Sequence, residues 1–264
     1  MQFNPLSALV LLGLLACGDK QDDTGISDTD TDDTDTDDTG SDTDTGSDTD
    51  TGSDTDTGSD DTVQFTFALS EFLSKAPIEG AVVTVGEESS TTGADGSVEL
   101  TLPANSYVKI DVEAKGFPIG HFQRYVGPIT WSTMRGMPSD ETIAVMGELL
   151  GLAADPSKGF MVFNVIFGDP RTSTDTAWLP GTTIDLDLDY DLALVADSSQ
   201  HTGLSVGNTT LEDSETSVTF LNVSPGEIDP TVTPPVGFIC ELIPDGVVIS
   251  PGHFHEMTVF CQEE

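Results

Sequence analysis

Short stretches in which apolar and polar residues alternate most constrain what this chain can fold into. Residues 63–69 and 108–114 alternate strictly, so that every second side chain is apolar, as a half-buried strand requires. Gly, Pro, Asn and Asp separate such stretches at turn positions, and the spacing between stretches is about 10 to 15 residues. This pattern predicts an all-β fold built from antiparallel sandwiches.

A second β region follows a change of period. Residues 139–154 carry apolar side chains at helical spacing, Ser139 can cap the N-terminus, and Asp155 and Pro156 can end the run. Strand patterns then resume, and the strongest alternation of the chain lies at residues 184–194. We therefore expect two small sandwiches, residues 62–138 and 157–264, joined by a helical connector at residues 139–156. One continuous domain of about 200 residues is the alternative.

The N-terminus has the features of an export signal. Residues 6–16 form an apolar run that is too short to span a bilayer but suits the hydrophobic region of a signal peptide. We assign residues 1–17 to this signal. Residues 18–61 contain 18 Asp and a single Lys among Thr, Ser and Gly. Such a segment has almost no apolar surface to offset the entropy of ordering, so we predict a disordered acidic tether.

The charge balance excludes one class of partner. The formal net charge is -39, and residues 62–264 alone carry -22. A basic groove that could neutralise phosphates is not visible, so we expect no nucleic-acid binding.

The sequence Leu14-Leu15-Ala16-Cys17 resembles the lipobox of bacterial lipoproteins. The resemblance implies that Cys17 becomes the new N-terminus and receives acyl chains, which makes a membrane the partner of the N-terminal lipid. It also implies a cell-envelope location, at the outer membrane and either periplasmic or surface-exposed. Two features depart from the pattern: the start lacks Lys and Arg, and Leu15 is larger than usual. The alternative is an ordinary signal peptide with a bystander cysteine.

With Cys17 assigned to lipid, Cys240 and Cys261 remain as an even pair in an exported chain. We predict a disulfide between them; two reduced, buried cysteines are the alternative.

The segments APIEGAVVTV and STTGADGSVELTLPANSYVKIDVEAKGF resemble the carboxypeptidase regulatory-like domain, a transthyretin-like sandwich. The match covers roughly residues 62–126, and residues 157–264 look like a second, more divergent copy. The resemblance implies the fold and says almost nothing about function, because this domain is appended to peptidases, receptors and surface lipoproteins alike.

Two groups of residues are candidates for metal ligands. Strict alternation would place the carboxylates of Asp185, Asp187, Asp189 and Asp191 on one strand face, where a divalent cation would relieve their repulsion. We favour a solvated outer face. His253 and His255 would also share a strand face, beside Glu256, but they lack the H-E-x-x-H spacing of a zinc site, and we interpret them as surface histidines.

The sequence contains no G-x-S-x-G elbow, Walker loop or dinucleotide fingerprint. We therefore expect no catalytic residue and no cofactor, and predict a non-catalytic cell-envelope lipoprotein whose sandwiches serve as binding or structural modules for a glycan or an envelope protein. Carbohydrate recognition by exposed aromatic side chains is one alternative, with Trp131 and Trp178 as candidates. An enzyme of unrecognised type is the other.

Overall fold

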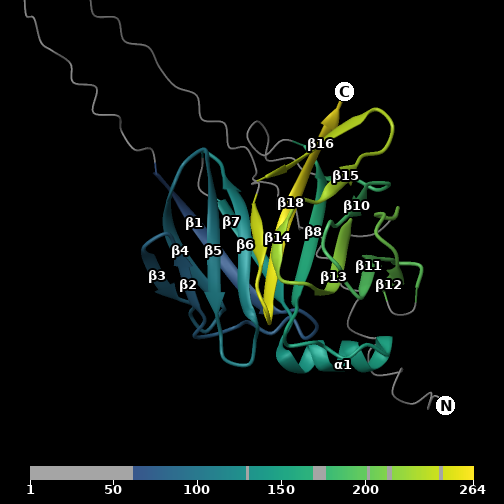
Figure 1. Cartoon of the computed structure of the whole chain (residues 1–264). Coiled ribbons are helices and arrows are strands. Elements are labelled where there is room, and N and C mark those ends of the chain that lie inside the picture. The colour runs from purple at the N-terminus through teal and green to yellow at the C-terminus, as the bar shows by residue number, and fades with distance from the viewer. Residues whose placement is uncertain (1–61, 129–130, 169–176, 201–202, 213–215, 244–245) are drawn as a thin grey trace, which may run out of the picture. The chain divides into compact units, whose positions relative to one another are not determined.

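The described part of the chain is all-β, as the sequence predicts. In the computed structural model, residues 62–264 are described except for 129–130, 169–176, 201–202, 213–215 and 244–245. This part holds eighteen strands and one helix (Figure 1). That helix falls short of the length and apolarity needed to cross a bilayer. The predicted signal peptide with Cys17 and the predicted tether lie outside the described residues.

The first half of the described chain is a sandwich of two sheets. One sheet has the strand order β4-β1-β7, and β1 pairs antiparallel with β4 and parallel with β7. The other sheet contributes the strands β6-β5-β2-β3. The strands of this half are β1 (Thr62–Glu71), β2 (Val82–Val85), β3 (Glu88–Thr91), β4 (Ser97–Pro103), β5 (Ser106–Glu113), β6 (Ile119–Val126) and β7 (Trp131–Met137).

The second half continues the larger sheet and adds two small ones. The larger sheet runs in the order β12-β11-β13-β8-β18-β6-β5-β2-β3, with β16 on β18 and β9 on β8, and the small sheets are β10-β15 and β14-β17. The strands of this half are β8 (Gly159–Phe167), β9 (Ala177–Trp178), β10 (Thr183–Asp185), β11 (Leu192–Ala196), β12 (Leu204–Val206), β13 (Ser217–Val223), β14 (Gly226–Ile228), β15 (Thr231–Thr233), β16 (Phe238–Ile243), β17 (Val247–Ile249) and β18 (His253–Glu263).

The last strand, β18, joins the two halves (Figure 1). It runs parallel to β8 along most of its length and parallel to β6 over its first four residues. β16 pairs antiparallel with the later residues of β18, along the same edge of β18 that pairs with β6 at its start. The sheet is therefore continuous from one half to the other, and it is mixed rather than wholly antiparallel.

Two hydrophobic cores lie on opposite faces of this shared sheet. Successive side chains of a strand point to opposite faces. On β18, Phe254 belongs to the core of the first half, whereas Met257 and Val259 belong to the core of the second. On β8, Val162 packs against the first core and Phe163 lies in the second. Along β8 and β18, one face of the shared sheet is thus buried in the first core and the other face in the second, as two sandwiches require.

The shared sheet bears on the predicted domain boundaries. The described residues between 62 and 264 form one compact unit, although they contain two cores. The division into residues 62–138, 139–156 and 157–264 stays a prediction. β18 is the last strand of the second segment and still contributes Phe254 to the core of the first.

The predicted helical connector is present but shorter than expected. Helix α1 spans Asp140–Leu150, and the side chain of Ser139 accepts a hydrogen bond from the backbone N–H of Thr142, as an N-cap does. The expected end at Asp155 and Pro156 is wrong. Gly151 takes the left-handed conformation, with φ 68°, and ends the helix there because glycine adopts this conformation at little steric cost.

Candidate metal centre

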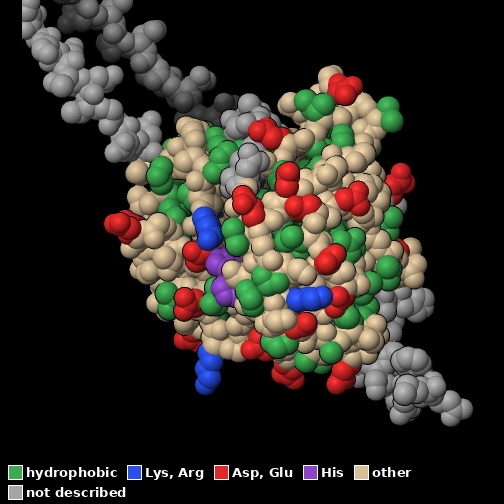
Figure 2. Space-filling model, in the orientation of Figure 1, with side chains coloured by type: hydrophobic (Ala, Val, Ile, Leu, Met, Phe, Trp, Pro, Cys, Tyr) green, Lys and Arg blue, Asp and Glu red, His purple; other side chains and the backbone are tan. Residues whose placement is uncertain are grey.

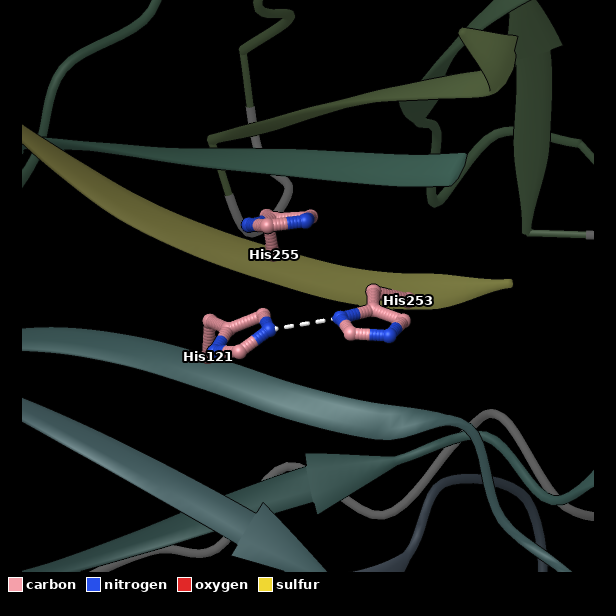
Figure 3. Close-up of side chains that lie close together, drawn as sticks. All are labelled: His121, His253 and His255. Atoms are coloured by element: carbon pink, nitrogen blue, oxygen red, sulfur yellow. Dashed lines mark hydrogen bonds between the residues drawn. The ribbon is translucent and has the colours of Figure 1, made fainter. Parts of the chain in front are cut away.

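Three histidine side chains converge on one face of the shared sheet. His121 lies on β6, and His253 and His255 lie on β18 (Figure 3). The parallel pairing of these strands sets His255 directly beside His121. One ring nitrogen from each histidine lies within 4.8 Å of those of the other two. Among the described residues, these three histidines are the group of His, Cys, Asp and Glu side chains whose ligand atoms lie close enough together to hold one metal ion.

The sequence predicted part of this group and misjudged its surroundings. His253 and His255 do share a strand face, as alternation predicts. Their interpretation as surface histidines is wrong for His255, which is only 4 % exposed, because the second core packs alongside it. His121 was missed, since it precedes His253 by 132 residues and no local pattern links them.

Hydrogen bonds orient two of the three rings. The Nδ1 atom of His121 lies 2.5 Å from a carboxylate oxygen of Asp111 on β5, and its Nε2 atom lies 2.8 Å from Nδ1 of His253. A carboxylate only accepts, so Nδ1 of His121 donates to Asp111. Between Nε2 of His121 and Nδ1 of His253, one nitrogen donates and the other accepts. His255 receives a longer bond at Nε2, 3.4 Å from the backbone N–H of Ser250.

Burial keeps two of these rings uncharged. Desolvation, and then the neighbouring histidines, lower the pKa of His255 to about 3. The pKa of His253 is lowered as well, again chiefly by desolvation and next by His121. Neutral imidazole is the form that binds metal ions.

The depressed pKa of His255 predicts a pH dependence of stability for the metal-free protein. The groups that face this ring are His121, His253, Asp111 and Lys109. Below pH 6.5 the unfolded chain binds a proton at His255 that the folded chain does not, so stability falls as the pH falls toward 3. We expect the free energy of unfolding, measured in urea with EDTA present, to drop by roughly 2 kcal/mol more between pH 7 and pH 5 than it does in His255→Gln. Parallel pH profiles for the two proteins would contradict this.

The arrangement can supply three nitrogen ligands to one ion. Three histidines and an open fourth position are a recurring protein environment for zinc, and imidazole also suits copper and nickel. The second nitrogen of such a ligand is commonly held by a carboxylate, as Asp111 holds His121. Histidine side chains gather at one spot on the face seen in Figure 2, which is otherwise scattered with acidic groups.

A buried ion pair lies on the opposite face of β18. Glu256 accepts hydrogen bonds from Arg124 of β6 and from Asn164 of β8. The guanidinium of Arg135 on β7 lies 3.5 Å from the same carboxylate oxygen. The side chains of Arg124 and Glu256 are 2 % and 6 % exposed. Neither arginine was singled out from the sequence.

The four predicted acidic candidates do not share a strand. Asp185 ends β10, and residues 186–191 belong to no strand, so the expected common face is wrong. Three of the carboxylates have separate partners: Asn208 donates to Asp185, the backbone N–H of Asp229 donates to Asp187, and Lys158 donates to Asp191. The alternating apolar residues Leu186, Leu188 and Tyr190 pack against the second core without forming a strand.

The remaining predicted residues are placed as follows. Cys240 and Cys261 form the predicted disulfide, directly opposite each other on β16 and β18. Trp178 on β9 is 47 % exposed. Trp131 opens β7, and its side chain lies outside the described residues. Cys17 also lies outside them.

Comparison with known proteins shows no family. No protein-family model matches the chain, and no curated protein matches it. Solved structures that resemble it include the Bacillus anthracis TIE protein, at 14 % identity and a TM-score of 0.26, covering 76 % of this chain and 34 % of that one. The minor pilin of Streptococcus agalactiae follows at 10 % identity and 0.30, covering 76 % and 96 %. The shaft pilin SpaA of Lactobacillus rhamnosus GG has 8 % identity and a TM-score of 0.23, covering 75 % of this chain and 96 % of that one.

These scores carry no argument about function. The chain spans about a third of the length of the TIE protein.

Proposed function

We propose that this protein is an exported, lipid-anchored cell-envelope protein whose β-sandwich is a non-catalytic binding module. The observation that supports export most directly is the disulfide between Cys240 and Cys261. Structural disulfides persist in oxidising compartments and are rare in the cytosol. Because the chain has three cysteines, the disulfide leaves Cys17 as the one available for lipid.

The position of Cys17 suits a membrane anchor at the end of a spacer. The first strand begins at Thr62, 45 residues after Cys17. A flexible chain of this length spans roughly 35 to 40 Å, and its acidic charges extend it further. We therefore expect the folded unit to lie away from the surface of the outer membrane.

The hydrogen bonding of the histidines argues against an enzyme of the serine or cysteine nucleophile type. A nucleophilic site of the serine or cysteine type pairs its nucleophile with a histidine base. In the described part, the histidine rings bond to Asp111, to each other and to the backbone of Ser250, and none bonds to a Ser, Thr or Cys side chain.

The proposed lipid anchor at Cys17 leads to a prediction about membrane attachment. Cys17→Ser should move the protein from the membrane fraction to the soluble fraction, because no acyl chain can then be attached. Immunoblots of fractionated cells, with membranes washed in high salt, measure this. Cys261→Ser is the control: it also replaces one cysteine by serine, yet the protein should stay with the membrane. A Cys17→Ser protein that remains membrane-bound would refute the lipid anchor.

Carbohydrate recognition is a second candidate, favoured by the exposure of Trp178. Aromatic rings stack on sugars when they are accessible. Glycan binding by the full-length protein, together with its loss in Trp178→Ala, would support carbohydrate recognition.

A further inference from the structure

We propose that His121, His253 and His255 form a mononuclear site for a divalent transition-metal ion of the class that prefers imidazole, such as Zn²⁺ or Cu²⁺. This goes beyond the proposed function, which leaves open what the module binds. The proposal stands on the convergence of three side chains from two strands that pair in parallel.

The spacing of the nitrogens is close to what such an ion needs. Zinc binds histidine nitrogen at about 2.0 to 2.1 Å in tetrahedral geometry, which separates neighbouring ligand nitrogens by about 3.3 Å. The nitrogens of His121 and His253 are 2.8 Å apart, and the set falls within 4.8 Å. The rings of His253 and His255 stack on that of His121, with centroids 5.0 and 4.6 Å apart, so metal binding requires the rings to rotate until their lone pairs converge.

Asp111 prepares His121 as a ligand. By accepting a hydrogen bond from Nδ1–H, the carboxylate favours the tautomer of the neutral ring whose Nε2 lone pair points toward His253. A metal ion would lie between these two nitrogens, and His253 would then carry its ring proton on Nε2 instead of Nδ1. The pairing of Asp111, His121 and His255 across three adjacent strands keeps the row in register.

The ring of His255 stacks on those of His121 and His253 and accepts one long hydrogen bond. It is buried, and its Nε2 atom receives only the 3.4 Å bond from Ser250. The row of paired residues continues from His255 to Met161 of β8, which lies in the second core and excludes water from that side. A buried imidazole with a weak partner is costly unless it binds something.

The ligand atoms select the class of ion. Calcium and magnesium prefer oxygen ligands, whereas three imidazoles suit zinc, copper and nickel. Three protein ligands leave a fourth position for water or an exogenous ligand.

The test uses the full-length Cys17→Ser protein with its disulfide intact, in which no thiol competes for metal. Titration with Zn²⁺ in a large excess of Ca²⁺, which occupies the carboxylates of residues 18–61, should show one equivalent bound. X-ray absorption of the zinc-loaded protein should show imidazole nitrogens at about 2.0 to 2.1 Å.

Variants assign the site. His121→Ala and His253→Ala should each weaken zinc binding by more than 100-fold, and Asp111→Asn should weaken it by about 10- to 100-fold. The control is His201→Ala, which removes the remaining histidine of the chain and should leave the stoichiometry and affinity unchanged. Circular dichroism checks that each variant is folded, and His253, which is only partly buried, is the substitution best tolerated.

Three results would overturn the proposal. These are zinc binding that excess Ca²⁺ abolishes, unchanged affinity in folded His121→Ala and His253→Ala, or loss of binding in His201→Ala instead. Each would place the metal on other ligands.

Discussion

Replacing Glu256 by Gln is expected to lower the free energy of unfolding by about 3 to 5 kcal/mol. The carboxylate lies between Arg124 and Arg135, and it is buried with the first of them. Burial already lowers the pKa of Arg124 to about 10, against the opposing attraction of Glu256. Removing the negative charge leaves two guanidinium groups facing each other without compensation.

Urea denaturation measures this effect, with Glu99→Gln as the matched control. Glu99 is exposed on β4, so its replacement should change stability by less than about 0.5 kcal/mol. A double-mutant cycle with Arg124→Met should reveal a strong coupling between Arg124 and Glu256. Equal stabilities for Glu256→Gln and Glu99→Gln would show that the ion pair contributes nothing net.

The location of Glu256 gives this pair a role in joining the halves. Arg124 and Arg135 belong to the first half, while Glu256 and Asn164 belong to the second. On the other face of β18, His253 and His255 meet His121 of the first half. The start of β18 is thus fixed by polar contacts on both faces, in addition to its pairing with β6 and β8.

Local sequence patterns predicted individual strands and the helix, but they did not predict how the strands pair. Alternation placed β1 and β5 correctly because one face of each strand is buried, which is a property of a few neighbouring residues. The same signal failed at residues 186–191, where every second residue is also apolar and reaches the core from an irregular segment. Alternation reports burial, and burial does not require a strand.

The candidate metal site depends on a pairing between distant segments. The sequence shows that His253 and His255 share a face, but the third ligand comes from β6, and a parallel pairing leaves no turn signal between its strands. For the same reason Arg124 and Arg135 could not be matched to Glu256. The Cys240–Cys261 disulfide could be predicted, because cysteine counting needs no knowledge of the fold.

Loss of the Cys240–Cys261 disulfide is expected to destabilise the protein by about 3 kcal/mol, the loop-closure entropy of a loop of this size. The bridge joins facing residues of β16 and β18, 21 positions apart, near the C-terminus. Without it, β16 and the last residues of β18 stay together only through their antiparallel pairing and side-chain packing, so this pair can separate more easily. The effect is measured by urea denaturation of Cys240→Ser/Cys261→Ser.

The position of β18 predicts which segments become less stable when the disulfide is lost. β16 pairs with the end of β18, whereas His253 to Glu256 at its start lie between β6 and β8. Hydrogen exchange in the variant should therefore rise in β16 and in the last residues of β18, while the start of β18 and the first core stay protected. Zinc binding should persist as well, because all three histidines lie in the protected region. An equal rise in exchange at β1 and β4 would show instead that the disulfide stabilises both halves as one cooperative unit.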